Sequence, residues 1–284
     1  MHKRACVLLK YGMALMLLSV SVMGARADVE PPDWRQNKSD KVWNQRIRPA
    51  IFHDRKIVTG DAASKVISLK APYRAEDASV VPISIQTGIA QTADHYIRRI
   101  YVYIDKNPVP LVGIFNFTPA SGRADLALRV RVDDFSYVRA IAEMNTGQLY
   151  MAKSFVRATG ACSAPPPKSI KDSIAEMGKM KIRTLGDLKY DKPDLVQVII
   201  KHPQVTGMQP LEIGSRYLPP AHFIKTIKVD YAGKPVMDAR LTFSISMDPS
   251  FRFFFVPKKS GELTVQAVDT EDNHWTSEHR ISGS

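Results

Sequence analysis

The side chain of this chain that is best suited to a chemical reaction is a cysteine that stands between small residues and a run of prolines. In the stretch ATGACSAPPP, residues 158–167, Cys162 follows a glycine and an alanine and precedes a serine. A cysteine that serves as a small hydrophobe usually lies within a strand or a helix. This composition predicts a flexible loop instead, and a thiolate on a loop can attack, accept and release sulfur species.

The neighbours of this cysteine have the properties of a movable arm. Gly160 frees the backbone, Ala161 and Ser163 add little bulk, and the three prolines that follow favour an extended strut. Arg157 and Lys168 flank the segment and would favour the thiolate if folding brings them close to it. We therefore expect the thiol to react fast with a thiol reagent in the native protein.

The N-terminal residues have the composition of a secretory signal. Basic residues precede the apolar run GMALMLLSVSVM (12–23), and the following ARA (25–27) offers small residues two apart, as signal peptidase prefers. The apolar run is shorter than the ~20 residues that a membrane-spanning helix needs. We therefore expect residues 1–27 to be cleaved after Ala27, which leaves an exported protein without a membrane anchor, periplasmic if the source is Gram-negative.

Cleavage would change both the cysteine count and the charge. It would remove Cys6, so that Cys162 remains as a single thiol that can form no internal disulfide. Four of the basic residues lie in the signal, so the formal net charge falls from +12 to 12 − 4 = +8. These charges occur in ones and twos and form no dense block, which argues against a nucleic-acid partner and favours attraction of acidic partners or anions.

Most of the remaining chain alternates apolar and polar residues with a period of two. Such runs predict half-buried strands, and their spacing, with turn signals between them, indicates antiparallel sandwiches in each half. Between the halves, residues 160–183 combine the proline run with about two turns of helix. The predicted strands are 80–86, 97–105, 110–118, 124–134, 136–144 and 149–158 in the first half, and 195–202, 222–231, 239–248, 250–258 and 262–270 in the second.

Two local predictions are specific enough to be checked directly. Residues 30–52 contain one short helix, which Ser39 or Asp40 would cap and Pro49 would limit. Residues 239–248 form a strand with one apolar face, made by Leu241, Phe243, Ile245 and Met247.

Other chemistries find little support in the sequence. No two histidines stand at metal-ligand spacing and the lone thiol adds no second soft ligand, so we expect no metal site. The chain has no nucleophile elbow, phosphate loop or dinucleotide fingerprint, so we expect no cofactor. A cysteine–histidine hydrolase stays open as an alternative, because folding could bring a histidine to Cys162.

Several motifs resemble the two subunits of a known sulfur carrier. LKAPYRAEDASVVPISI (69–85) and TGAC (159–162) are similar to SoxY, the cysteine-bearing subunit of the bacterial thiosulfate-oxidation carrier. The second half resembles its partner SoxZ, and the whole resembles a SoxYZ fusion of the quinoprotein dehydrogenase-associated type. The SoxZ-like motifs are KHPQVTGMQ (201–209), PPAHFIKTIKV (219–229), GKPV (233–236) and SFRFFFVPKKSGELTVQAVDTEDNHWTSE (250–278).

The resemblance implies an all-β protein of two immunoglobulin-like antiparallel β-sandwich domains, packed tightly and joined by a short Pro-rich linker. We place the SoxY-like domain at 28–158, the cysteine arm and linker at 159–182, and the SoxZ-like domain at 183–284. The resemblance also implies a carrier without turnover of its own, with Cys162 as the covalent attachment site. Its partners would be periplasmic sulfur-oxidising enzymes and cytochromes.

Two alternatives stay open at this point. The chain could be an accessory or carrier protein of a periplasmic quinoprotein (PQQ) alcohol dehydrogenase system, with a different cargo. It could also be a non-covalent β-sandwich binding module in which Cys162 is incidental.

Overall fold

The computed structural model describes residues 34–164, 170–210 and 216–282. The predicted signal, residues 1–27, and the flanking Lys168 lie outside the described residues. Within the described part of the chain, no helix is long and apolar enough to cross a membrane.

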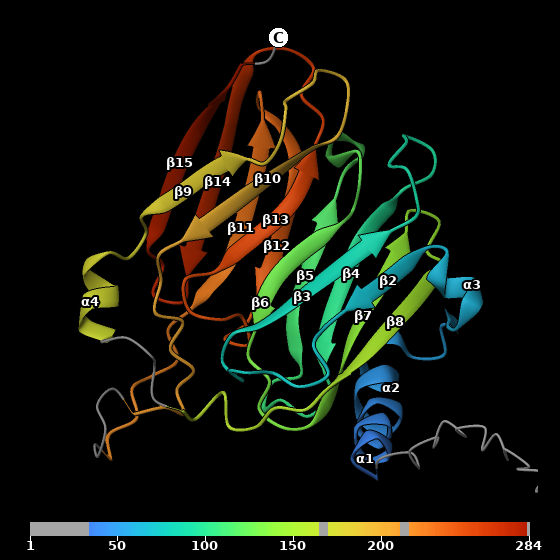
Figure 1. Ribbon diagram of the computed structural model, residues 1–284, viewed down its shortest axis with the longest axis vertical. Helices are drawn as coiled ribbons and strands as arrows, with labels where there is room; N and C mark the ends of the chain where they lie inside the picture. Colours follow the sequence, from blue (N-terminus) through green and yellow to red (C-terminus); the bar gives the residue numbers. More distant parts are fainter. Residues whose placement is uncertain (1–33, 165–169, 211–215, 283–284) are drawn as a thin grey trace, which may run out of the picture. The chain divides into compact units, whose positions relative to one another are not determined.

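Two sheets contain all the named strands of the described chain, which confirms the all-β class (Figure 1). The pairings are antiparallel except that of β1 with β8, which is parallel. Sheet A has the order β1-β8-β7-β4-β5-β12-β11-β14-β15, and sheet B has the order β2-β3-β6-β13-β10-β9.

The strands of sheet A are β1 (Ile57–Val58), β4 (Ile97–Ile104), β5 (Leu111–Phe117), β7 (Ser136–Met144), β8 (Leu149–Val156), β11 (Ile224–Tyr231), β12 (Lys234–Leu241), β14 (Gly261–Asp269) and β15 (His274–Ile281). The strands of sheet B are β2 (Ile67–Lys70), β3 (Val81–Thr87), β6 (Leu126–Val130), β9 (Met180–Thr184), β10 (Asp194–Ile200) and β13 (Ser250–Phe255). The helices are α1 (Trp34–Val42), η1 (Trp43–Ile47), α2 (Arg48–Phe52), α3 (Asp61–Ser64), η2 (Pro119–Ser121) and α4 (Ile170–Ala175).

Both sheets continue across the junction between the two halves of the chain. In sheet A, β5 of the first half pairs with β12 of the second. In sheet B, β6 pairs with β13 through two residue pairs. Each junction gives an otherwise open strand edge a partner. A single cluster of buried apolar side chains draws on strands of both halves, so the expected tight packing of the halves is confirmed.

The predicted short helix begins and ends elsewhere. Ser39 and Asp40 lie inside α1 rather than before it, because the Ser39 hydroxyl donates to the buried carboxylate of Asp105 at 2.7 Å and so serves the tertiary fold. Pro49 does not end the helix. It lies in the first turn of α2, after the π-helical turn η1, where a missing N–H costs little.

The predicted strand at 239–248 is also displaced. The strand in this region, β12, starts at Lys234 and ends at Leu241, and the chain after it turns instead of alternating. The apolar residues of the predicted strand are buried as expected, but Ser244 and Ser246, which lie between them in the sequence, are fully buried too. They are covered because this segment lies against the end of β6, where Arg131 N donates to Ser244 O and Ser246 N donates to Arg129 O.

We expect the two neighbouring phenylalanines of β13 to differ sharply in their contribution to stability. Phe253 is fully buried and pairs with Leu126 across the junction, whereas Phe254 lies on the other face and stacks with Arg123. Phe253→Ala should lower the free energy of unfolding by about 3–5 kcal/mol, as a buried cavity does. The control Phe254→Ala should cost about 1 kcal/mol or less. Urea denaturation measures both, and equal losses would contradict the shared core.

Candidate functional site

The chain after β8 forms a tight turn that carries the cysteine. Gly160 has a φ of +78°, a left-handed conformation that a glycine adopts without strain. Its N–H donates to the carbonyl of Asp133 at 2.8 Å, and Ala164 N–H donates to the carbonyl of Gly160 at 2.9 Å. The arm, residues 160–164, is therefore a closed turn that lies against the segment after β6.

Side chains from both halves of the molecule hold Cys162 in place. Its N–H donates to Asp133 Oδ1 at 2.8 Å, and its carbonyl accepts from the hydroxyl of Thr206 at 2.6 Å. Asp133 belongs to the first half and Thr206 to the second, in the loop of residues 202–209 that we call the docking loop. Only 1% of Cys162 is exposed, so this arrangement closes the thiol off from solvent.

A buried arginine clasps the arm to the docking loop. Arg131 is 1% exposed and donates from Nη1 to the carbonyl of Ala161 at 3.3 Å and from Nη2 to the carbonyl of Gln204 at 3.2 Å. Its Nε has no hydrogen-bond partner, and no carboxylate lies within ion-pair distance of it in the described part of the chain. The cation is thus satisfied only by backbone carbonyls, one from each side.

This environment keeps the thiol protonated. The pKa of Cys162 is raised from its ordinary value of 9.0 to about 12, mainly by burial and also by the charge of Asp133, while the charge of Arg131 acts in the opposite direction. The thiolate is the reactive form of a cysteine. In the docked position Cys162 is therefore an unreactive, protonated thiol.

These contacts correct the expectation of an exposed thiol. Of the small residues around it, Ala161 is buried and Ser163 is exposed, so the arm covers Cys162 instead of presenting it. Arg157 stacks on Tyr73 and Phe135, and the cation beside the thiol is one that the sequence did not single out. The residues missed by sequence reasoning are Arg131, Asp133 and Thr206, and the available signal was the KHPQVTGMQ motif that supplies the docking loop.

Two histidines and an aspartate meet next to the docking loop, although they are far apart in the sequence. The Nε2 atoms of His202 and His222 lie 3.5 Å and 2.6 Å from Asp269 Oδ2. The ligand atoms of the three side chains lie within 4.8 Å of one another, so the cluster has the composition of a metal site. The expectation of no paired histidines therefore holds only along the chain, not in space.

The hydrogen bonds of this cluster fit a proton-bearing network better than a metal site. Gln204 N–H donates to His202 Nδ1 at 3.1 Å, so a neutral His202 carries its proton on Nε2, which faces Asp269. Burial is the main cause that lowers the pKa of His202 to about 4. Burial alone would raise the pKa of Asp269, but hydrogen bonds from Asn273, His222 and the backbone lower it to about 2. A metal on Nε2 would have to displace that proton.

The described contacts of Cys162 do not include a histidine. Within the described part of the chain its hydrogen bonds go to Asp133 and Thr206, and the histidine network is connected to the arm through Gln204 and Arg131. A hydrolytic cysteine needs a base within hydrogen-bond reach. This conformation therefore does not assemble the cysteine–histidine pair of the hydrolase alternative.

Comparison with protein families finds two matches in the chain. The family model described as "Sulfur oxidation protein SoxY" matches residues 48–162, and the one described as "Sulphur oxidation protein SoxZ" matches residues 182–280. The first match ends at Cys162. The two families support a role as a sulfur-oxidation carrier, whereas a search of curated proteins finds no match.

Solved structures show only partial likeness. A superoxide reductase (neelaredoxin) from Ignicoccus hospitalis is 23% identical with a TM-score of 0.31, over 36% of this chain and 94% of that one. A putative superoxide reductase from Thermotoga maritima is 22% identical with a TM-score of 0.31, over 37% and 95%. The fibronectin(III)-like modules of Clostridium thermocellum CbhA are 9% identical with a TM-score of 0.24, over 76% and 94%. Scores this low carry no functional conclusion.

The docked thiol should be alkylated slowly. Because its pKa is about 12 rather than 9.0, iodoacetamide should modify Cys162 at pH 8 about a hundredfold or more slowly in native protein than in urea-unfolded protein. Asp133→Asn removes the neighbouring charge and should raise the native rate by about tenfold. The neighbour Asp134→Asn is the matched control. Equal native and unfolded rates would contradict the docked state.

The histidine network should make the fold sensitive to acid. As the pH falls below 6.5, His202 in the unfolded chain takes up a proton, whereas folded His202 stays neutral until about pH 4. Its contribution to stability is therefore present above pH 6.5 and lost between 6.5 and 4, by about 3 kcal/mol. Urea denaturation across this range should show the loss in wild type and a smaller one in His202→Asn. The exposed His274→Asn should keep the wild-type slope.

Proposed function

Because the chain joins a SoxY domain to a SoxZ domain and belongs to both families, we propose that it is a carrier that holds a sulfur-oxidation intermediate covalently on Cys162. The observation that carries this proposal is the way the thiol is held. Asp133 of the SoxY domain accepts from the backbone N–H of the cysteine, and Thr206 of the SoxZ domain donates to its carbonyl. The thiol is buried where the two domains meet, so the fold itself controls when it is exposed.

The attachment is an oxidation that the carrier cannot perform alone. When the Cys162 thiol joins the sulfane sulfur of a thiosulfate-like anion, an S–S bond forms, the thiol loses its proton and two electrons leave. A redox enzyme, such as a cytochrome, must accept those electrons. Hydrolysis of the outer sulfonate needs a second enzyme. The chain itself therefore acts as the carrier, and turnover belongs to its partners.

The docked conformation fits the resting state of such a carrier. Buried beside Asp133, the thiol is protonated and protected from adventitious oxidation. For loading, the arm has to leave the docking loop, which breaks the hydrogen bonds of Thr206 and Arg131 to the arm. Once exposed, the thiol would return towards its ordinary pKa and could react.

We further propose that the carrier is exported to the periplasm, where partner enzymes of sulfur oxidation would meet it. The composition of residues 1–27 supports this. N-terminal sequencing of the protein from its host should begin at Asp28, and a sequence that starts at Met1 would contradict export.

The covalent role predicts a mass adduct on one residue. Intact mass spectrometry of protein from the host periplasm should show a sulfonate or sulfane adduct on Cys162. The adduct should vanish on treatment with a thiol reductant, because the attacking thiolate displaces sulfur bound through sulfur. Cys162→Ala should carry no adduct. It should also fail to support growth on the sulfur compound whose use by the host requires this gene.

The exposed neighbour provides a matched control. Ser163→Ala changes the same turn but leaves the thiol, so adduct and growth should stay at wild-type level. A glutathione mixed disulfide or a disulfide dimer as the sole modification would oppose the carrier role. Normal growth of Cys162→Ala on every sulfur or alcohol substrate that needs the gene would refute it.

A further inference from the structure

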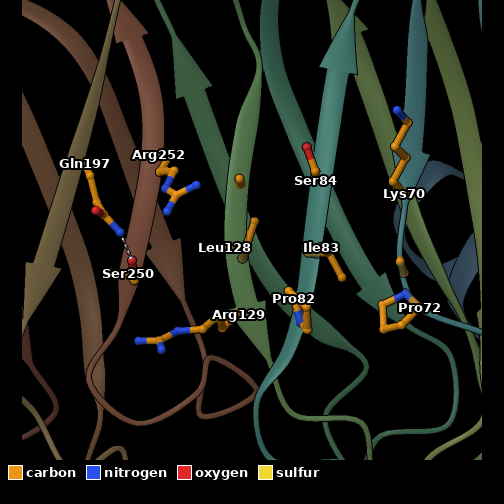
Figure 2. Close-up of a pocket in the computed structure, with 12 residues that line it drawn as sticks. Lys70, Pro72, Pro82, Ile83, Ser84, Leu128, Arg129, Gln197, Ser250 and Arg252 are labelled. Carbon is orange, nitrogen blue, oxygen red and sulfur yellow. Dashed lines mark hydrogen bonds between the residues drawn. The ribbon is translucent and has the colours of Figure 1, made fainter. Parts of the chain in front are cut away.

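The outer face of sheet B carries a groove that the proposed function does not use. It has a volume of about 520 Å³ and runs over β2, β3, β6, β13 and β10, so it crosses the junction of the two domains. Figure 2 shows its lining side chains, with the guanidinium groups of Arg252 and Arg129 on either side of Ser250. Gln197 donates to that serine hydroxyl at 3.0 Å.

The register of the strands explains why the face is hollow. Consecutive cross-strand pairs place Lys70 beside Ser84, Ser84 beside Ala127, and Ala127 beside Arg252 in a single row. The two middle residues are small and the two outer ones are long. The long side chains therefore form walls over a low floor, and three strand spacings of ~4.8 Å put their backbones about 14 Å apart.

The charge of the groove has one sign. Its lining contains Lys70, Arg129 and Arg252 and no carboxylate. Arg129 donates to the backbone carbonyl of Asp248 at 2.8 Å, and the carboxylate of that residue pairs instead with Lys201 at 2.7 Å. Lys70 and Arg252 are exposed, and no ion pair to either is found in the described chain.

The dimensions favour a polypeptide over a small anion. A volume of about 520 Å³ is that of a site for a drug-sized molecule or a short peptide, far more than a single oxyanion fills. Four residues of extended chain span about 14 Å, which equals the separation of the two outer cations. Two acidic side chains four positions apart would each meet one of them.

The groove also leads towards the arm. Arg129 lines one end of it, and two residues farther along the same chain Arg131 holds the carbonyl of Ala161. An acidic segment bound over Arg129 would thus lie next to the turn that carries Cys162. The groove and the arm therefore contact residues that lie two positions apart at the end of β6.

We propose that this basic groove is the docking surface for an extended acidic segment of the enzyme that receives the arm. Lys70 and Arg252 bind its carboxylates, and the floor of Ser84 and Ala127 accommodates its backbone. The identity of the partner as an arm-receiving enzyme rests on the proposed function, but the binding of an acidic segment does not.

The test uses a fluorescein-labelled peptide, Gly-Glu-Ser-Ser-Ser-Glu-Gly, and the full-length carrier. Fluorescence anisotropy should show binding that weakens with added sodium chloride, and a peptide with glutamine in place of both glutamates should not bind. Lys70→Ser/Arg252→Ser should weaken binding about tenfold, the effect of two exposed ion pairs. Lys234→Ser/Arg240→Ser removes the same charge from the exposed face of β12 in sheet A and should leave binding unchanged.

Three outcomes would overturn the proposal. They are no binding to wild type, equal weakening by the two double variants, and displacement of the peptide by sodium sulfate at an ionic strength where sodium chloride does not displace it. The last result would assign the groove to a small anion. Cys162→Ala should bind the peptide as wild type does, so failure of the groove and failure of the covalent carrier role remain distinguishable.

Discussion

The pairing of β5 with β12 and of β6 with β13 is the constraint on which the rest of the structure depends. Each pairing joins a strand of one domain to a strand of the other, so both sheets and the core between them run through the whole described fold. The same pairing fixes the end of β6 against the segment after β12. It thereby brings Asp133, from one domain, to the same turn as Thr206, from the other. Without this junction, Cys162 would lose one of these two contacts.

The strands were accessible to sequence reasoning because residue types alternate along them, even in β4 and β7, where both faces are buried. This alternation recovers β3, β4, β5 and β7 almost to the residue. It fails at β12 because Pro235 suggests a turn. The structure tolerates this proline within a strand because its pair with Asp230 follows a register irregularity and lies beyond the residues that pair with β5. Short strands such as β1 and β2 carry too few residues for a period to be recognised.

The sequence predicted that Cys162 is the residue of chemical interest, but it did not predict that the residue is buried or which residues contact it. Small neighbours and prolines describe the arm correctly as irregular. Whether such a segment is free or covered depends on partners that lie 29 and 44 residues away, Asp133 and Thr206. The same holds for His202 and Asp269, which are separated by 67 residues. Contacts at these separations follow from strand order, and local composition does not encode strand order.

Arg131 has a consequence for the balance between the covered and the released arm. Its guanidinium is buried among carbonyl oxygens instead of carboxylates, and one of its hydrogens is bonded to the arm itself. If the arm leaves as the proposed function requires, the cation and the carbonyls that it released must be hydrated. Release therefore takes up water, and solutes that are excluded from protein surfaces oppose it. Under the proposed function, the fraction of the carrier with an exposed thiol would therefore fall as the osmolarity around it rises, because the arm would return to the docking loop.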